Sequence, residues 1–261
     1  MSIFLKTEDE IELMRQANSL VGRTLGELAK HIRPGISTLQ LDKIAEEFIR
    51  DHGAQPTFKG FPNPLGSSPF PASICTSVND VVVHGIPDAR TILKEGDIVS
   101  IDCGTIYKGY NGDSCYTFCV GEVSEDIQRL LATTKESLYK AIDVAQAGYH
   151  LGDIGHAVQS HCESKGYGVV RVLTGHGIGR KMHEEPQIPN YGDEGTGILL
   201  KSGMCLAIEP MITMGSRKVM LMSDRWTIKT VDGKPAAHFE HTIAVRRGKA
   251  EILSSFSEIE S

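Results

Sequence analysis

A short sequence pattern that occurs twice constrains the fold of this chain more than any other feature. The two copies lie 107 residues apart: Lys94-Glu95-Gly96 followed by Ile101-Asp102, and Lys201-Ser202-Gly203 followed by Ile208-Glu209. A third match places an acid eight residues before a glycine in each half, Asp113 before Gly121 and Glu240 before Gly248. Self-similarity at a fixed offset is typical of a duplicated supersecondary unit. The pattern therefore predicts two similar units, although glycine-punctuated α/β segments also match one another by chance.

The elements around these matches follow the same order in both halves. Apolar residues three or four positions apart predict helices from Thr7 to Pro34, from Ser37 to Gly53 and over about 124–146. A shorter helix is expected after Gly148, ending near residue 165. Residues 54–72 are expected to be loop. Short β-branched runs predict strands over 73–78, 81–83, 97–103, 116–120, 169–174, 204–209, 226–230 and 237–245. The sequence thus predicts an α+β chain with one domain over 1–261, built from two helix-helix-strand-strand halves, about 1–122 and 123–261.

Composition and charge favour a folded globular protein over a membrane-spanning, exported or nucleic-acid-binding one. Hydrophobic residues make up 40% of the 261 residues, as in a folded globular chain. The net charge of -6 has the wrong sign for binding nucleic acid through bulk charge. No apolar stretch reaches the roughly 18 residues of a membrane span, and the first ten residues turn acidic where a signal peptide is apolar. Six scattered cysteines without a CxxC pair indicate reduced thiols. We therefore expect a cytoplasmic protein.

Four acids stand where a strand should be buried. Asp102 and Glu209 end apolar runs, Asp113 precedes a strand-like run, and Glu240 lies within another. A buried carboxylate is costly unless a cation satisfies it, and none of the four has a Lys or Arg beside it in the sequence. A salt bridge to a distant Arg would explain any one of them. Four together favour a divalent metal.

A metal site of carboxylates normally recruits an imidazole as well. The candidate is His176 in Gly175-His176-Gly177-Ile178-Gly179, where the glycines permit close backbone approach. Taken alone, this histidine would be an ordinary residue of a glycine-rich turn. Together with four carboxylates it indicates a two-metal site of the kind used in hydrolases, holding manganese, iron or cobalt rather than structural zinc.

Seven ordered motifs give the chain a family resemblance. They are Ser77-Val-Asn-Asp-Val-Val-Val-His84-Gly-Ile-Pro87, Gly96-Asp-Ile-Val-Ser-Ile-Asp102, Asn111-Gly-Asp113, Gly175-His176-Gly-Ile-Gly-Arg180, Met182-His183-Glu-Glu-Pro186, Ala207-Ile-Glu209-Pro-Met211 and Phe239-Glu240-His-Thr242. In this order, over essentially the whole chain, they resemble the bacterial type I methionine aminopeptidases. The resemblance implies the pita-bread fold, in which two pseudo-symmetric halves surround a central antiparallel sheet.

The resemblance also implies roles for individual residues. Asp113 and Glu240 would bridge two divalent ions, His176 and Glu209 would complete one, and Asp102 would chelate the other. The ions would activate a water molecule for hydrolysis, and Glu209 would take the water proton and pass it to the leaving amine.

Two further histidines match residues that contact substrate in the family. His84 and His183 would hold the peptide as charge develops on it. Without the family, His84 is equally a strand-end histidine of the core, and His183, followed by Glu184-Glu185, is equally a member of a surface ion pair.

A methionine side chain calls for an apolar pocket with sulfur and aromatic neighbours. By motif position Phe70, Cys75, Met182 and Trp226 would line that pocket, although such residues are more often plain core. Residues 63–69 resemble an insertion just before the pocket segment. The insertion leaves the roles of Phe58 and Phe61 open.

The implied function is removal of the initiator methionine from nascent chains when the second residue is small, with the ribosome as the expected place of action. A monomer is expected, with neither nucleic acid nor a membrane as partner. A proline-directed peptidase of the same fold would carry a further N-terminal domain, and a type II enzyme a long helical insertion. A catalytically silent interaction protein would have lost metal ligands, whereas all five are present. Release of methionine from a Met-Ala peptide, abolished by chelation, separates these alternatives.

Overall fold

The computed structural model describes residues 3–260, so Met1, Ser2 and Ser261 at the ends of the predicted domain lie outside the described residues. The first two helices begin where their caps predict. α1 (Glu8–Ala29) follows Thr7, whose hydroxyl accepts a hydrogen bond from the backbone N–H of Glu10. α2 (Thr38–Asp51) follows Ser37 in the same way. Each cap satisfies a backbone N–H that the helix leaves free.

The strands of the first half include a long hairpin that the sequence predicted only in part. The elements are β1 (Gln55–Pro56), β2 (Ile74–Val78), β3 (Val81–Val83), β4 (Ile98–Tyr107) and β5 (Tyr110–Cys119). β4 and β5 pair along their whole length, and the turn at Lys108 and Gly109 has positive φ at both residues. The predicted strands 97–103 and 116–120 were therefore too short.

The second half repeats the order of two helices followed by strands. The helices are α3 (Glu125–Val144) and α4 (Leu151–Ser164). The strands are β6 (Gly168–Val169), β7 (Thr174–Gly177), β8 (Glu184–Pro189), β9 (Cys205–Ile208), β10 (Met211–Thr213), β11 (Val219–Leu221), β12 (Ile228–Thr230), β13 (Ala236–His238), β14 (His241–Arg246) and β15 (Gly248–Ile252), before a last helix, α5 (Ser257–Glu260). The sequence analysis missed β8, β10, β11, β15 and α5, and it missed β1 inside the predicted loop 54–72. The predicted strand 169–174 is wrong for residues 170–173, which separate β6 from β7.

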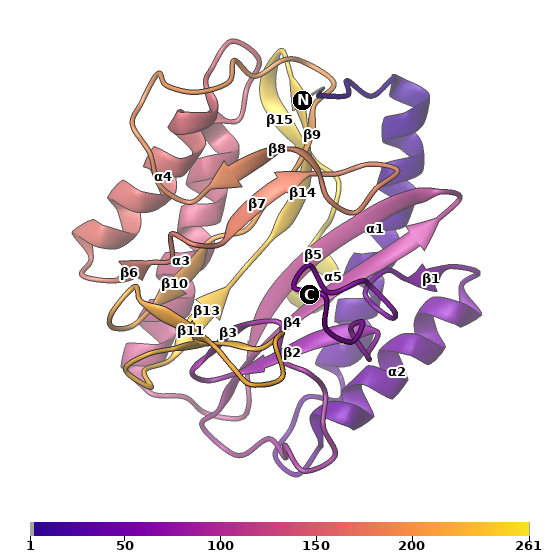
Figure 1. Ribbon diagram of the computed structural model, residues 1–261, viewed down its shortest axis with the longest axis vertical. Helices are drawn as coiled ribbons and strands as arrows, with labels where there is room; N and C mark the ends of the chain where they lie inside the picture. The colour runs from indigo at the N-terminus through magenta and orange to yellow at the C-terminus, as the bar shows by residue number, and fades with distance from the viewer. Residues whose placement is uncertain (1–2, 261) are drawn as a thin grey trace.

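The helices flank the strands on two sides (Figure 1). α1 and α2 lie beside β2, β4 and β5, while α3 and α4 lie on the opposite side of the molecule, beside the sheet of order β15-β14-β9-β7-β8. Every ladder between named strands is antiparallel. This arrangement confirms the predicted α+β class with central antiparallel sheets.

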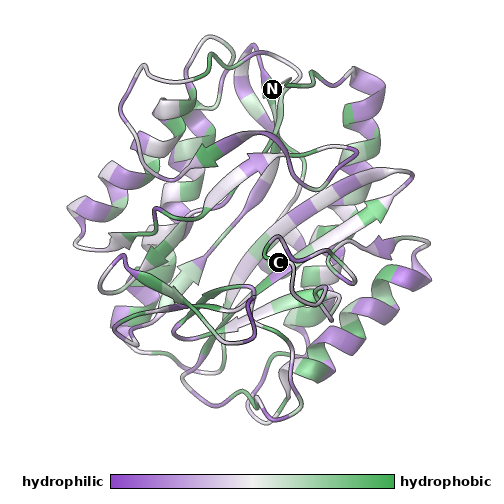
Figure 2. Cartoon of the chain, in the orientation of Figure 1, coloured by the Kyte–Doolittle hydropathy of each residue, from purple (hydrophilic) through white to green (hydrophobic). Residues whose placement is uncertain are grey.

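Two main apolar cores lie between the helices and the strands. One joins α1 and α2 to β2 and β4, and the other joins α3 and α4 to β9 and β14. Hydrophilic residues lie on the outer sides of α2 and α4, with hydrophobic residues toward the sheets (Figure 2). Within residues 3–260 no helix has the length and apolar character that a membrane crossing requires.

Candidate metal centre and active site

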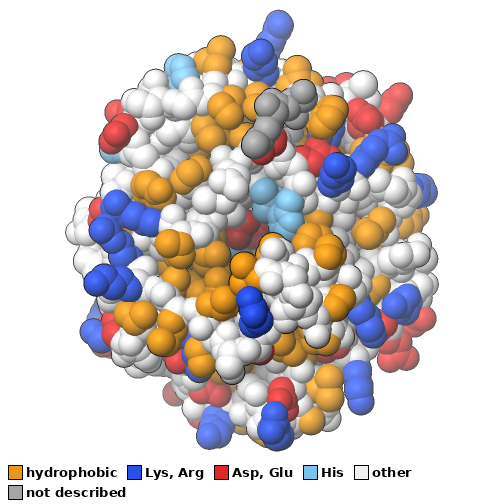
Figure 3. Space-filling view, in the orientation of Figure 1, with side chains coloured by type: hydrophobic (Ala, Val, Ile, Leu, Met, Phe, Trp, Pro, Cys, Tyr) orange, Lys and Arg blue, Asp and Glu red, His pale blue; other side chains and the backbone are white. Residues whose placement is uncertain are grey.

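A cavity of about 630 Å³ lies between the two halves of the chain, and all eleven residues predicted for the site lie in its wall. In the space-filling view the molecule is hollowed at its centre, with acidic atoms at the bottom of the hollow and histidine atoms at its rim (Figure 3). The structure thus brings together residues that stand as far apart in the sequence as Phe70 and Glu240.

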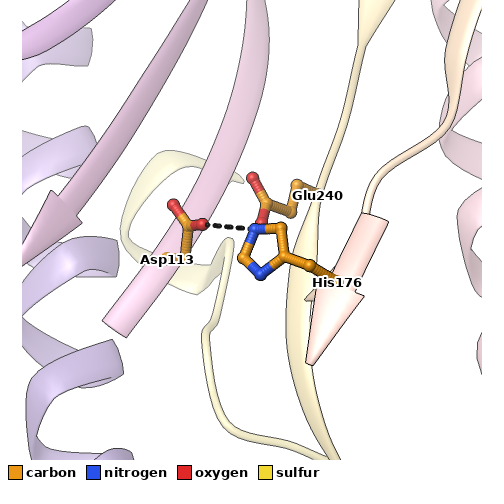
Figure 4. Close-up of side chains that lie close together, drawn as sticks. All are labelled: Asp113, His176 and Glu240. Atoms are coloured by element: carbon orange, nitrogen blue, oxygen red, sulfur yellow. Dashed lines mark ion pairs between the residues drawn. The ribbon is translucent and has the colours of Figure 1, made fainter. Parts of the chain in front are cut away.

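Three buried side chains form the centre of the site. Asp113 on β5, His176 on β7 and Glu240 between β13 and β14 each offer a donor atom, and these atoms all lie within 4.8 Å of one another. His176 Nε2 is 3.5 Å from Asp113 Oδ2 (Figure 4). Nδ1 of His176 donates to the carbonyl of Gly177 at 2.9 Å, since that oxygen can only accept. This hydrogen bond leaves Nε2 free to bind a metal.

The other two predicted ligands, Asp102 and Glu209, lie beside this trio. Asp102 pairs with Cys115 and Asp113 with Gly104 in the β4–β5 ladder, so the two acids are diagonal neighbours on one face of the hairpin. Glu209 follows β9 directly, and its Oε1 is 3.8 Å from His176 Nε2. The sequence placed Asp102 at a strand end, which is wrong. Asp102 lies inside β4, and Asp113 lies inside β5 rather than before it, because the hairpin continues past both acids.

The buried acids of this cluster have a donor set that suits a cation. Asp102 Oδ1, Asp113 Oδ1 and Glu240 Oε1 are buried and have no hydrogen-bond partner among the described residues. Burial, together with the charges of Asp113 and Glu209, raises the pKa of both Asp102 and Glu240 well above the usual range. Three orphaned carboxylate oxygens with one imidazole nitrogen fit a divalent metal that favours oxygen ligands.

His176 lies on a strand and not in the predicted glycine-rich turn. It pairs with Ala207 on β9 and with Gln187 on β8. The predicted reason for the flanking glycines is nevertheless confirmed. A Cβ atom on Gly175 would lie 2.3 Å from the carbonyl oxygen of Ala207, and one on Gly177 would meet the neighbouring backbone at the same distance. Only glycine lets β7 approach both neighbours closely enough to place His176.

The two predicted substrate histidines face the cavity from opposite elements. His84 follows β3 with a φ of 57°, a left-handed conformation that costs energy in a residue with a side chain. Burial lowers the pKa of His84. His183 is open to the cavity, with its ring centroid 4.4 Å from that of His176 and edge-on to Phe61. The surrounding protein and His176 lower the pKa of His183 to about 4. Both rings are therefore neutral near pH 7.

The surface ion pair considered for His183 does not form among the described residues. Glu184, the neighbouring acid, instead accepts from Lys6 Nζ at 2.5 Å, and both of these side chains are more than nine-tenths buried.

Aromatic and sulfur side chains form the apolar part of the wall. Phe70, Cys75 and Met182 are buried, and Trp226 meets Phe70 edge to face with 5.2 Å between ring centroids. Trp226 Nε1 donates to the carbonyl of Ser68 at 3.0 Å, so the 63–69 segment contacts the pocket directly.

Three residues near the site were missed or left open by the sequence. Phe58 and Phe61, whose roles the insertion had obscured, both line the cavity. His238 is buried, with Nε2 at 3.4 Å from Glu209 Oε2. The available signal was a histidine two positions before Glu240, directly after two alanines.

Comparison with known proteins gives a family match over most of the chain. The model of metallopeptidase family M24 matches residues 12–247. A methionine aminopeptidase of Clostridium acetobutylicum is 50% identical over 252 residues, covering 97% of this chain and 98% of that protein. The crystal structure of a methionine aminopeptidase from Thermotoga maritima superposes with a TM-score of 0.93 at 44% identity, covering 97% of this chain and 100% of that one. A Xaa-Pro dipeptidase from Bacillus anthracis shares the fold at 23% identity with a TM-score of 0.74, but this chain covers only 62% of it.

Proposed function

Because this chain belongs to metallopeptidase family M24 and has methionine aminopeptidases as relatives at about half identity, we propose that it removes the initiator methionine from nascent proteins whose second residue is small. The pita-bread fold and the class of metal-dependent aminopeptidase follow from the family. The observation that supports the rest is the group of orphaned carboxylate oxygens of Asp102, Asp113 and Glu240 at the bottom of an apolar cavity.

We assign five residues to two divalent ions of cobalt, manganese or iron. Asp113 and Glu240 would contact both ions, His176 and Glu209 would complete one site, and Asp102 would hold the other. Bound ions supply Lewis acidity, which activates water and polarises the scissile carbonyl. The free α-amine of the substrate would be held next to Asp102, which limits cleavage to the first residue.

The remaining steps belong to side chains of the cavity. Glu209 accepts the proton of the attacking water and passes it to the leaving amine. His183 and His84 hold the carbonyl oxygen and the peptide nitrogen through hydrogen bonds, which neutral imidazoles make as donor or acceptor. The lowered pKa values of both rings keep them neutral across physiological pH.

The apolar wall would select the methionine side chain. Phe70 and Trp226 present ring edges and faces, Cys75 and Met182 present sulfur, and all four line the cavity. A flexible, polarizable thioether gains contact with both kinds of neighbour.

The wider setting is also proposed. We infer one domain formed by two repeats, about 1–122 and 123–261, because two helices precede the strands in each half. The free thiols of all six cysteines are consistent with a cytoplasmic location. We further propose a monomer that meets nascent N-termini at or near the ribosome.

The direct experiment measures methionine release from two peptides by metal-loaded protein. Met-Ala-Ser should be cleaved and Met-Leu-Ser should not, and excess chelator should stop the reaction. At saturating metal, Glu209→Gln should abolish turnover, with metal bound more weakly than in wild type. Calorimetric titration of the metal-free protein should show two equivalents. Cleavage of an Ala-Pro peptide instead would favour a proline-directed peptidase, and failure with every peptide would favour a silent interaction protein.

A further inference from the structure

A buried histidine that the mechanism above does not use lies directly beside Glu209. His238 is the last residue of β13 and is 2% exposed. Its Nε2 atom is buried without a hydrogen-bond partner among the described residues. A buried polar atom left unpaired costs about 1–3 kcal/mol. A side chain that carries this cost at the edge of an active site is a candidate for a functional role.

The two oxygens of Glu209 face two different histidines. Oε1 is 3.8 Å from His176 Nε2, the nitrogen that belongs to the metal cluster. Oε2 is 3.4 Å from His238 Nε2. Oε1 is therefore the oxygen on the side of the metal ligands, and Oε2 is the one turned toward β13. The backbone carbonyl of Glu209 is held separately, by the side-chain amide of Asn190 at 2.9 Å.

The backbone of His238 is fixed by the hairpin that carries two of the metal ligands. Thr117 on β5 donates its hydroxyl to the carbonyl of His238 at 2.7 Å and accepts from the His238 backbone N–H at 3.0 Å. Since the single hydroxyl proton of Thr117 is used in the first bond, Ser100 on β4 must donate to Thr117, at 2.8 Å. The ring of His238 is thereby held at a defined position relative to Asp102 and Asp113.

We propose that His238 is a positioning residue for Glu209. With metal bound, its Nε2–H would donate to Glu209 Oε2, 3.4 Å away in this structure, and would hold the carboxylate with Oε1 turned toward the metal and the attacking water. Ligands of a metal are commonly oriented by such an outer partner, and losing the partner typically weakens metal binding by about 10–100-fold. The inference rests on the proposed function of Glu209 and extends it to a residue outside the cavity wall.

The test compares His238→Leu, which removes the donor, with His238→Gln, which keeps an N–H donor of similar reach. Cobalt affinity is measured by calorimetry, cobalt coordination by visible absorption, and folding by thermal unfolding of the metal-free protein. We expect His238→Leu to lose about 10–100-fold in affinity and to alter the cobalt spectrum, while His238→Gln stays near wild type. The metal-free His238→Leu protein should unfold no earlier than wild type, because an unpaired buried atom has been removed. A purely structural role predicts the reverse, with lost stability and unchanged affinity.

Two further variants keep the test decisive if His238→Leu does not fold. Thr117→Val removes both bonds to the His238 backbone and should weaken cobalt binding in the same direction. In a Glu209→Gln background, His238→Leu should add no further loss, since the two residues act through one contact. Wild-type affinity in His238→Leu, or equal weakening in the Leu and Gln variants, overturns the proposal. If wild-type protein binds cobalt but releases no methionine, the proposed function fails independently of this result.

Discussion

The glycine before His176 offers a sharp test of how the site is built. In Gly175→Ala the new Cβ atom would lie 2.3 Å from the carbonyl oxygen of Ala207, whereas ordinary contacts begin near 3.4 Å. Strands β7 and β9 must therefore separate by about 1 Å, because backbone on both sides cannot rotate out of the way. His176 moves with β7 and so shifts relative to Glu209, which directly follows β9.

The expected losses follow from this displacement. Overpacking costs about 1–3 kcal/mol of unfolding free energy, and a misplacement of about 1 Å at a catalytic centre costs on the order of 100-fold in rate. We expect Gly175→Ala to lower kcat/KM by about two orders of magnitude and to weaken metal binding. Thermal unfolding, calorimetry with manganese and the rate of methionine release measure the three effects.

A second glycine gives the matched control. A Cβ atom on Gly22 in α1 would lie 2.7 Å from the carbonyl oxygen of Ser255, a comparable overlap that does not involve the cavity wall. Gly22→Ala should lower the free energy of unfolding through this overlap, partly offset by the roughly 1 kcal/mol that alanine gains over glycine in a helix. Its kcat/KM should stay unchanged. If Gly175→Ala keeps the wild-type kcat/KM, the close approach of β7 and β9 does not set the position of His176.

Three further outcomes are expected. Removing metal with excess chelator should abolish methionine release and lower the unfolding temperature. The second effect follows because ions at about 100 times their Kd stabilise the folded protein by about 2.7 kcal/mol. An unchanged unfolding temperature would contradict a metal site among the buried acids. Trp226→Ala should raise KM for methionyl peptides, because the contact between Trp226 and Phe70 is lost, while metal affinity stays constant. A fall in kcat alone would contradict a role of Trp226 in the pocket. Asp42→Ala should lose about 1–3 kcal/mol of unfolding free energy, because Asp42 Oδ1 accepts from the backbone N–H groups of Ser73 and Ile74; Asp42→Asn, which retains the acceptor oxygen, should lose less.

The first residues of helices and the set of buried acids could be predicted from the sequence, because both depend on residues that are close together along the chain. A capping box such as Thr7 with Glu10 involves four consecutive residues, and the structure forms it as predicted. The high cost of burying a carboxylate likewise marks Glu209 at the end of an apolar run without any knowledge of its partner. The cavity contains the acids that this argument selected.

The extents of the strands could not be predicted, because they depend on pairing between distant segments. Residues 104–115 include Gly104, Gly112 and several polar residues without clear alternation, yet they form the turn and the adjoining half of the β4–β5 hairpin. Gly112 is required there because a Cβ atom would lie 2.6 Å from the backbone of α1, a contact that no local pattern reveals. The strand position of His176 and the approach of His238 to Glu209 depend on non-local packing in the same way.

The order of the metal ligands along the chain has a consequence for the synthesis of the protein itself. Asp102 and Asp113 lie on one hairpin in the first half, but Glu240 lies in the second half, after β13. Translation at about 5–20 residues per second would make Glu240 roughly 7–28 seconds after Asp102. Until then the hairpin holds its two acids without the third carboxylate of the cluster. The full set of candidate metal ligands can therefore come together only after both halves of the chain have been synthesised.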